Sequence, residues 1–178
     1  MGRKSTFLDE ENIPASSKVI YCFTPFEKPD DSGKFVFKVG KSRYFGNRLE
    51  SFHTDYVDGV FLLRVLELKD ANRREHKIKN FEAFLSLAEK QVFDLLQQNG
   101  AKRLRSQTRV KQRNEDGGVT EWFYGSSQSI HRAFQRLHSL FGGILHTYTF
   151  QNKATKASYD ERKEIGYSGE TIVDLKFV

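Results

Sequence analysis

The chain has little of several features that mark special classes of protein. Among its 178 residues it has one cysteine, Cys22, three prolines and one methionine. A lone cysteine can form neither an intrachain disulfide nor a thiolate metal site by itself. The apolar runs, such as residues 60–63, are too short for a membrane-spanning helix, and the first residues lack the apolar stretch of a secretory signal. We therefore expect an intracellular protein, cytoplasmic or nuclear, that is not secreted and does not enter a membrane.

What the chain does contain is enough apolar material for a core, and a localised positive charge. Hydrophobic residues make up 38% and aromatic residues 13%, which argues against disorder, and the length fits one domain with a tail. The formal net charge of +6 comes from one segment, residues 101–113, which holds six basic residues and no acidic one. These six are Lys102, Arg103, Arg105, Arg109, Lys111 and Arg113.

A basic cluster of this kind is the expected electrostatic footprint of nucleic-acid binding. Basic side chains that neutralise phosphates release condensed counterions, which drives association. Outside residues 101–113 the chain carries 23 basic and 23 acidic residues, so the excess charge has one place on the molecule. We expect this segment to be a loop or an edge strand that contacts DNA, with RNA as the alternative partner. Lys41 is a further candidate contact.

The pattern of residue types along the chain predicts an α+β fold. It indicates a small central antiparallel sheet of about three strands, flanked by helices. The strands are expected at residues 18–24, 35–39 and 60–68, with a further short strand at 119–125 and candidate strands at 144–150 and 171–177. The helices are expected at residues 45–53, at 70–99, and from Ser126 or Ser127 to Phe141. The 70–99 segment is either one helix or two helices with a bend near Asn80.

The domain organisation follows from the same pattern. Residues 1–17 are expected to be a flexible lead-in. Residues 18–143 are expected to form the domain, with a basic insertion around residues 100–118, and residues 144–178 a C-terminal extension. No internal repeat divides the domain further.

Several short motifs follow one another along the expected domain. They are VIY at 19–21, KVGKS at 38–42, Arg48-Leu49, a D-A-x-x-x-E-x-x-I stretch at 70–78, and EWF at 121–123. In this order and spacing they resemble the GIY-YIG nuclease superfamily, and more closely its variant branch in phage and viral proteins, the T5orf172-like domains. The resemblance covers roughly residues 18–125.

The resemblance implies a site that hydrolyses phosphodiester bonds. Tyr21 would correspond to the first-motif tyrosine, which helps to activate the attacking water as a general base. Arg48 would hold the scissile phosphate. Glu75 would bind a single Mg²⁺ ion, and Glu89, which lies on the same side of an unbroken helix, is the alternative ligand. His53 is a further candidate, as a proton shuttle.

Lys38 stands where the family has its second tyrosine. A phenol can accept a proton once it is deprotonated, whereas a lysine stays charged near neutral pH unless it is buried. Lys38 could instead contact a phosphate as a point charge. Two hypotheses follow. The first is a Mg²⁺-dependent DNA endonuclease, and the alternative is a catalytically weak nucleic-acid-binding module of the same fold.

Overall fold

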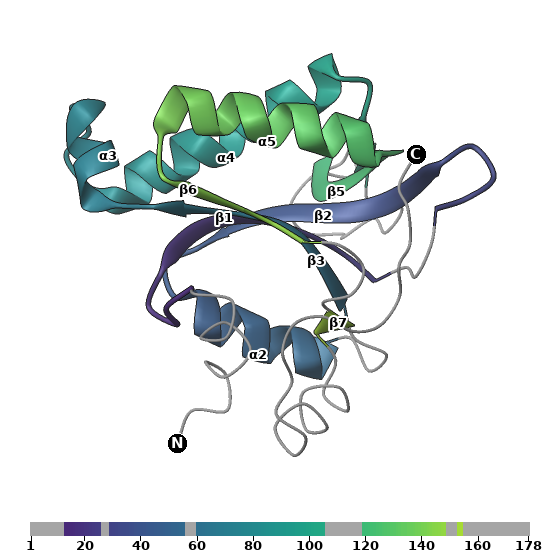
Figure 1. Ribbon diagram of the computed structural model, residues 1–178, viewed down its shortest axis with the longest axis horizontal. Coiled ribbons are helices and arrows are strands. Elements are labelled where there is room, and N and C mark those ends of the chain that lie inside the picture. Colours follow the sequence, from purple (N-terminus) through teal and green to yellow (C-terminus); the bar gives the residue numbers. More distant parts are fainter. Residues whose placement is uncertain (1–12, 26–28, 56–59, 106–118, 149–152, 155–178) are drawn as a thin grey trace, which may run out of the picture.

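A seven-stranded antiparallel sheet organises the part of the chain that the computed structural model describes, which is residues 13–25, 29–55, 60–105, 119–148 and 153–154 (Figure 1). Six strands lie in the order β4-β5-β2-β1-β3-β6, and the short β7 pairs with β3. The strands are β1 (Lys18–Thr24), β2 (Lys34–Ser42), β3 (Val60–Leu68), β4 (Lys102–Arg105), β5 (Val119–Ser126), β6 (Ile144–Thr147) and β7 (Lys153–Ala154).

Helices cover both faces of this sheet. Helix α2 (Phe45–Asp55) lies on one face, while α4 (Phe81–Gln98) and α5 (Ser127–Phe141) lie together on the other (Figure 1). The short α3 (Asp70–Glu75) precedes α4 and lies at one end of the α4 and α5 layer. The sheet therefore has an α2 face and an α4/α5 face, and each face has its own core.

The prediction of a sheet of about three strands was wrong, although the α+β class holds. The three expected strands, β1, β2 and β3, form the centre, but β2 also pairs with β5, and β3 also pairs with β6. Both outer strands of this centre carry buried side chains, such as Phe37 in β2 and Leu66 in β3. The backbone groups along such strands are costly to leave unpaired beside a core, so the sheet continues on both sides.

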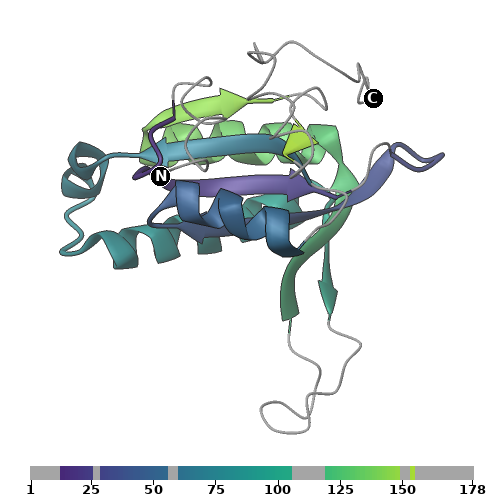
Figure 2. The same cartoon turned by 90° about the horizontal axis from the view of Figure 1, so that it is seen from below.

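The first part of the basic segment is an edge strand. β4 contains Lys102, Arg103 and Arg105, and among the described strands it pairs only with β5. Figure 2 shows that β4 and β5 run together away from the body of the sheet. The remaining predicted contacts, Arg109, Lys111 and Arg113, lie outside the described residues. Half of the predicted basic contact surface is therefore described, and it belongs to the sheet itself.

The predicted helical segment 70–99 is two helices rather than one. Asn80 is the N-cap of α4, and its side-chain oxygen accepts a hydrogen bond of 2.8 Å from a backbone N–H of the first turn. The Arg73 guanidinium donates to two backbone carbonyls of the connecting turn at 2.7 and 3.0 Å, which fixes the direction of the break. Glu75 and Glu89 therefore lie on different helices, and helical periodicity does not place them on one side.

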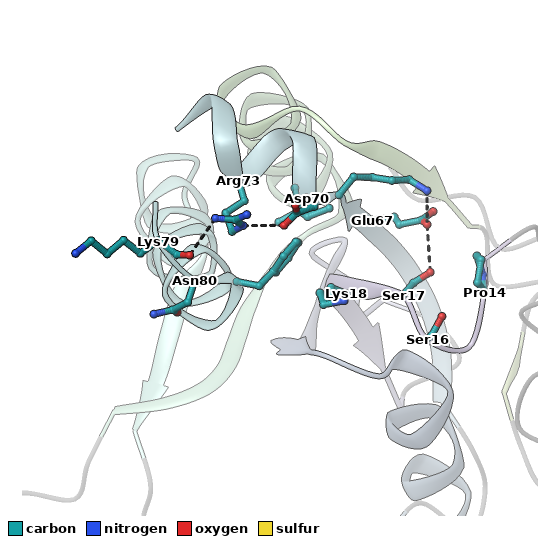
Figure 3. A pocket seen from close by; sticks show the side chains of 12 residues that line it. Pro14, Ser16, Ser17, Lys18, Glu67, Asp70, Arg73, Lys79 and Asn80 are labelled. Carbon is teal, nitrogen blue, oxygen red and sulfur yellow. Dashed lines mark hydrogen bonds and ion pairs between the residues drawn. The ribbon is translucent and has the colours of Figure 1, made fainter. Parts of the chain in front are cut away.

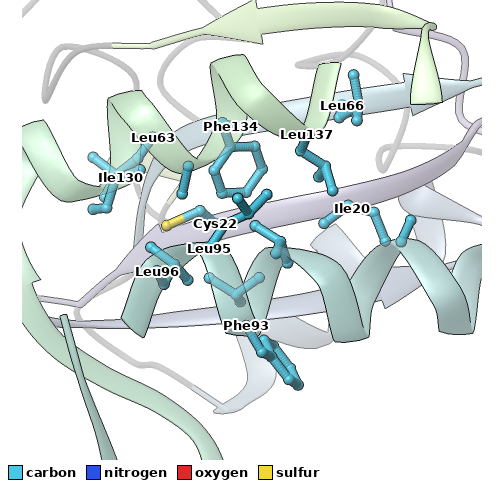
Figure 4. Close-up of a cluster of buried hydrophobic side chains, with 14 of the residues drawn as sticks. Ile20, Cys22, Leu63, Leu66, Phe93, Leu95, Leu96, Ile130, Phe134 and Leu137 are labelled. Carbon is cyan, nitrogen blue, oxygen red and sulfur yellow. The ribbon is translucent and has the colours of Figure 1, made fainter. Parts of the chain in front are cut away.

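The larger core lies on the α4/α5 face of the sheet (Figure 4). Side chains alternate along β1, so Ile20 and Cys22 point to this face while Tyr21 and Phe23 point to the α2 face. Cys22 is completely buried, and this burial raises the pKa of its thiol well above the ordinary value. Cys22 is thus a neutral core residue rather than a reactive thiol.

Residues beyond the expected domain boundaries contribute to the packing. Ile13, from the predicted lead-in, is completely buried in the core of the α2 face. At the other end, β6 belongs to the predicted C-terminal extension and pairs with β3. Residues 1–12 and 155–178 lie outside the described residues. Within the described ranges, no helix is long and apolar enough to cross a membrane.

Candidate functional site

Tyr21 and Gly40 are direct neighbours on the antiparallel strands β1 and β2. The Tyr21 ring packs on the α2 face against the rings of Phe45 and Phe52, with centroids 6.0 and 5.5 Å away. Its hydroxyl lies over Gly40, because a Cβ placed on this glycine would be only 2.5 Å from the Tyr21 Oη. Tyr21 is 2% exposed. The phenol is therefore fixed beside the last residues of β2, with almost no contact with solvent.

A polar pocket opens where β2 ends and α2 begins. Ser42 shapes this turn, because its Oγ accepts a hydrogen bond of 3.2 Å from the Tyr44 N–H. The pocket has a volume of about 450 Å³. It is lined by Lys41, Ser42, Arg43, Tyr44, Asn47, Arg48, Ser51 and Glu82.

Arg48, the predicted phosphate-binding residue, lines this pocket from the exposed side of α2. Its guanidinium forms no hydrogen bond or ion pair with any residue that the structure describes. An arginine with unused donors can bind two phosphate oxygens at once, and its planar group fits them without rearrangement. Arg48 is therefore available to an anionic ligand.

A second cation of the pocket, Lys41, extends from β2 toward α4. Its Nζ donates a hydrogen bond of 2.5 Å to the Ser86 Oγ and lies 3.2 Å from the Glu82 Oε1, and both partners belong to α4. The Arg43 Nε lies 3.8 Å from the other oxygen of Glu82. The pocket is thus a meeting point of β2, α2 and α4. Its lining holds three cations, Lys41, Arg43 and Arg48, against the single carboxylate of Glu82.

Glu89 lies two helical turns after Glu82 on α4 and is half-buried. Burial is the main cause that raises the pKa of Glu89 above its ordinary value. The charges of Lys41 and Arg103 oppose this rise, and the carboxylates of Glu121 and Glu82 add to it. Its oxygens form no hydrogen bond or ion pair with another described residue. A carboxylate that is costly to ionise and has unused oxygens is one that a bound cation would stabilise.

Glu75, the first choice of metal ligand from the sequence, lies elsewhere. It is the exposed last residue of α3, and it does not line the pocket of Arg48. The next residue, His76, packs its ring on Phe84 and Phe141 with centroids 5.5 and 5.0 Å away, which holds this part of the chain against the α4 and α5 layer (Figure 1). The structure thus brings Glu89, and not Glu75, close to the pocket lysine Lys41.

Lys38, the residue in the second tyrosine position, is engaged with β5. Its Nζ lies 3.5 Å from the Glu121 Oε2 and 5.8 Å from the centroid of the Trp122 ring. Glu121 and Trp122 belong to the EWF motif, so the two motifs meet across the β2 and β5 pair. The ammonium is held by a carboxylate and an aromatic ring of β5, so Lys38 helps to join the two strands.

The remaining predicted residues are spread around this end of the sheet. His53 lies in α2, and its side chain is outside the described part of the structure. Arg103 is half-buried, with its guanidinium carbon 4.4 Å from the Phe93 ring centroid and 5.9 Å from that of Phe123. Lys102, its neighbour in β4, is exposed. Lys102 is thus the more accessible of these two predicted contacts.

The donors near the pocket fit a magnesium ion. No group of three or more His, Cys, Asp or Glu side chains gathers among the described residues. Mg²⁺ does not require one, because it keeps several waters and is commonly held by one or two carboxylates together with substrate phosphates. Glu89, with unused carboxylate oxygens close to Lys41, is the donor that suits this kind of site.

Comparison with known proteins found no match: no protein-family model, no curated protein and no solved structure matches the chain.

Glu82, Ser86 and Tyr44 are neighbours of the site that we did not predict from the sequence. The first two could have been found from their positions seven and three residues before Glu89 on one helix. Tyr44 carried no such signal.

Proposed function

We propose that the protein is a Mg²⁺-dependent DNA endonuclease whose site lies at the pocket of Arg48. The observation that carries the proposal is the approach of three elements: Arg48 on α2 and Lys41 on β2 share one pocket, and Glu89 on α4 lies near Lys41. The resemblance to the GIY-YIG nucleases supports the role of Arg48, whereas Glu89 lies outside the D-A-x-x-x-E motif that holds Glu75. Neither Glu75 nor Glu89 lines the pocket, and Glu89 takes the role of metal ligand in the proposal because its carboxylate interacts electrostatically with the pocket residues Lys41 and Glu82.

Each residue has a distinct task in this proposal. Arg48 binds the scissile phosphate and offsets the negative charge that grows on its oxygens as water attacks. Lys41 adds a second positive charge on the same side. The resemblance implies that Tyr21, once deprotonated, takes the proton of the attacking water, and this role requires that water reaches its oxygen beside Gly40. Glu89 holds Mg²⁺, which when bound supplies Lewis-acid stabilisation of the phosphate and of the leaving oxygen.

The experiment is a nicking assay on negatively supercoiled plasmid with Mg²⁺. Wild type should convert the plasmid to the open-circular form. Arg48→Ala and Glu89→Ala should slow nicking by about 10²-fold or more, since each removes a group that stabilises transition-state charge. Glu75→Ala is the matched control, because it removes the same functional group from the exposed end of α3. Equal nicking by all four proteins contradicts the proposal.

One observation favours the alternative, a nucleic-acid-binding module of the same fold with weak catalysis. Tyr21 is 2% exposed, and Lys38 is paired with Glu121, so both positions from which the family activates water are engaged in packing. This alternative predicts no metal-dependent nicking but strong, salt-dependent binding. With about six phosphate contacts from the basic segment, log K should fall with log salt with a slope of about −5 on duplex DNA. Salt-independent binding contradicts it.

A further inference from the structure

Tyr44 is an exposed aromatic side chain at the pocket of Arg48. It is 57% exposed, more than the other exposed large hydrophobic residues of the described chain, which are Leu87 at 38%, Leu140 at 39% and Ile144 at 46%. It lines the pocket beside Arg48, and its ring makes no contact with another aromatic ring among the described residues. An aromatic ring left in water contributes little to folding, so the Tyr44 ring is available to a ligand that enters this pocket.

The backbone holds Tyr44 in place although its side chain is free to meet a ligand. Its N–H donates to the Ser42 Oγ at 3.2 Å. The next two N–H groups donate to backbone carbonyls of the segment before β1, that of Phe45 to Ser17 at 3.1 Å and that of Gly46 to Ala15 at 2.9 Å. A ring presented from a fixed backbone, with only two side-chain torsions, loses little entropy when a ligand stacks on it.

The surroundings of the ring identify the ligand. Arg48, Lys41 and Arg43 make the pocket cationic despite Glu82, which suits a phosphate. An aromatic face beside a phosphate-binding arginine suits a base attached to that phosphate. A base inside a continuous duplex is stacked on its neighbours and cannot lie on a tyrosine ring, whereas an unpaired base can.

We propose that Tyr44 is a stacking platform for one unpaired base, and that the preferred ligand of the site is single-stranded or locally unpaired DNA. The proposal rests on the proposed function only for the phosphate at Arg48. It assigns to Tyr44 a part in choosing the substrate and no part in the chemical step. It agrees with the use of supercoiled plasmid above, because negative supercoiling favours local unpairing.

The test is binding in EDTA, so that no cleavage is needed. Fluorescence anisotropy compares a labelled single-stranded oligonucleotide with the duplex of the same sequence. Tyr44→Ala should weaken single-strand binding about 5- to 150-fold, which is the range expected for one lost stacking contact, and should change duplex binding far less. Tyr44→Trp should keep single-strand binding. Leu140→Ala, a partly exposed apolar side chain on α5, is the control and should bind like wild type.

A second readout reports stacking directly. A 2-aminopurine base in the single strand should be quenched by wild type and by Tyr44→Trp, and not by Tyr44→Ala. Unchanged single-strand binding by Tyr44→Ala, or an equal loss on single strand and duplex, overturns the proposal. If wild type then still nicks plasmid in the separate assay with Mg²⁺, the proposed function stands without the stacking platform. If Tyr44→Ala loses single-strand binding while no protein nicks plasmid, the platform stands and the nuclease function fails.

Discussion

Two regions of the molecule each place a glutamate, Glu67 or Glu89, out of full contact with solvent and near a lysine, and the two carboxylates differ in their partners. At the end of β3, the side chain of Glu67 is 5% exposed and has a partner for each oxygen. Its Oε1 accepts from the Ser17 Oγ at 3.1 Å (Figure 3). The same oxygen lies 3.2 Å from the Lys69 Nζ, and the Oε2 lies 3.3 Å from the His146 Nε2. Near Lys41, by contrast, the half-buried Glu89 has no such partner among the described residues.

The difference separates a structural carboxylate from one that is suited to a ligand. The partners of Glu67 tie together the segment before β1, the end of β3 and the edge strand β6, so its charge stabilises the sheet. A pocket of about 580 Å³ adjoins it, larger than the pocket of Arg48. Both carboxylates of its lining are already paired, Glu67 with Lys69 and Asp70 with Arg73 at 2.8 Å. The volume of a pocket therefore does not select the candidate site. The proposal relies instead on charged groups that have no partner among the described residues, Arg48 and Glu89.

The largest expected effect comes from removing the structural carboxylate, Glu67. Glu67→Ala should lower the free energy of unfolding by about 2 kcal/mol, because it removes a buried carboxylate and leaves Ser17, Lys69 and His146 without their acceptor. Urea unfolding followed by circular dichroism measures this. The control is Asp94→Ala, an exposed carboxylate on α4 that should change stability by no more than about 0.5 kcal/mol. Equal effects of the two changes would mean that the Glu67 cluster does not stabilise the fold.

The second prediction tests whether Glu89 binds Mg²⁺. Mg²⁺ should raise the thermal midpoint of wild type, because a ligand that binds only the folded state stabilises that state. At a Mg²⁺ concentration of roughly ten times Kd, the free energy of unfolding should increase by about 1.4 kcal/mol. Glu89→Gln should abolish the shift, and Glu75→Gln should keep it. Differential scanning fluorimetry with and without Mg²⁺ gives the answer without any cleavage. A shift retained in Glu89→Gln and lost in Glu75→Gln would reverse the assignment of the metal ligand.

Much of the local structure could be predicted from the sequence, because it depends on local signals. The β-branched and aromatic residues of 18–24 and the largely apolar run of 60–68 predict strands with the same ends as β1 and β3. Tyr21, Lys38 and Arg48 could likewise be placed on β1, β2 and α2 from the sequence, because each lies in a short local motif. The extent of the sheet could not be predicted, since the pairing of β2 with β5 joins residues far apart in the chain.

The sequence also could not distinguish between Glu75 and Glu89 as the candidate metal ligand. Glu75 and Glu89 are fourteen residues apart and would share a side of one helix, so the pattern could not separate them. The Asn80 cap and the bonds of Arg73 in the turn place the two glutamates on different helices, because they end the first helix and redirect the chain. The exposure of Tyr44 depends likewise on how β2 meets α2, which no periodicity encodes.

The smallest expected effect concerns the stability of the Glu89 site without metal. Burial raises the pKa of Glu89, so the folded protein binds its proton more tightly than the unfolded chain does. The ionised carboxylate therefore destabilises the fold above this raised pKa, and the penalty disappears as pH falls through it to below the ordinary glutamate value. Glu89→Gln should raise the thermal midpoint in EDTA near pH 8, by less than the magnesium shift, and this gain should vanish near pH 3. Glu75→Gln should show no such gain. A loss of stability in Glu89→Gln at pH 8 would mean that this carboxylate, like that of Glu67, is held by partners and stabilises the fold.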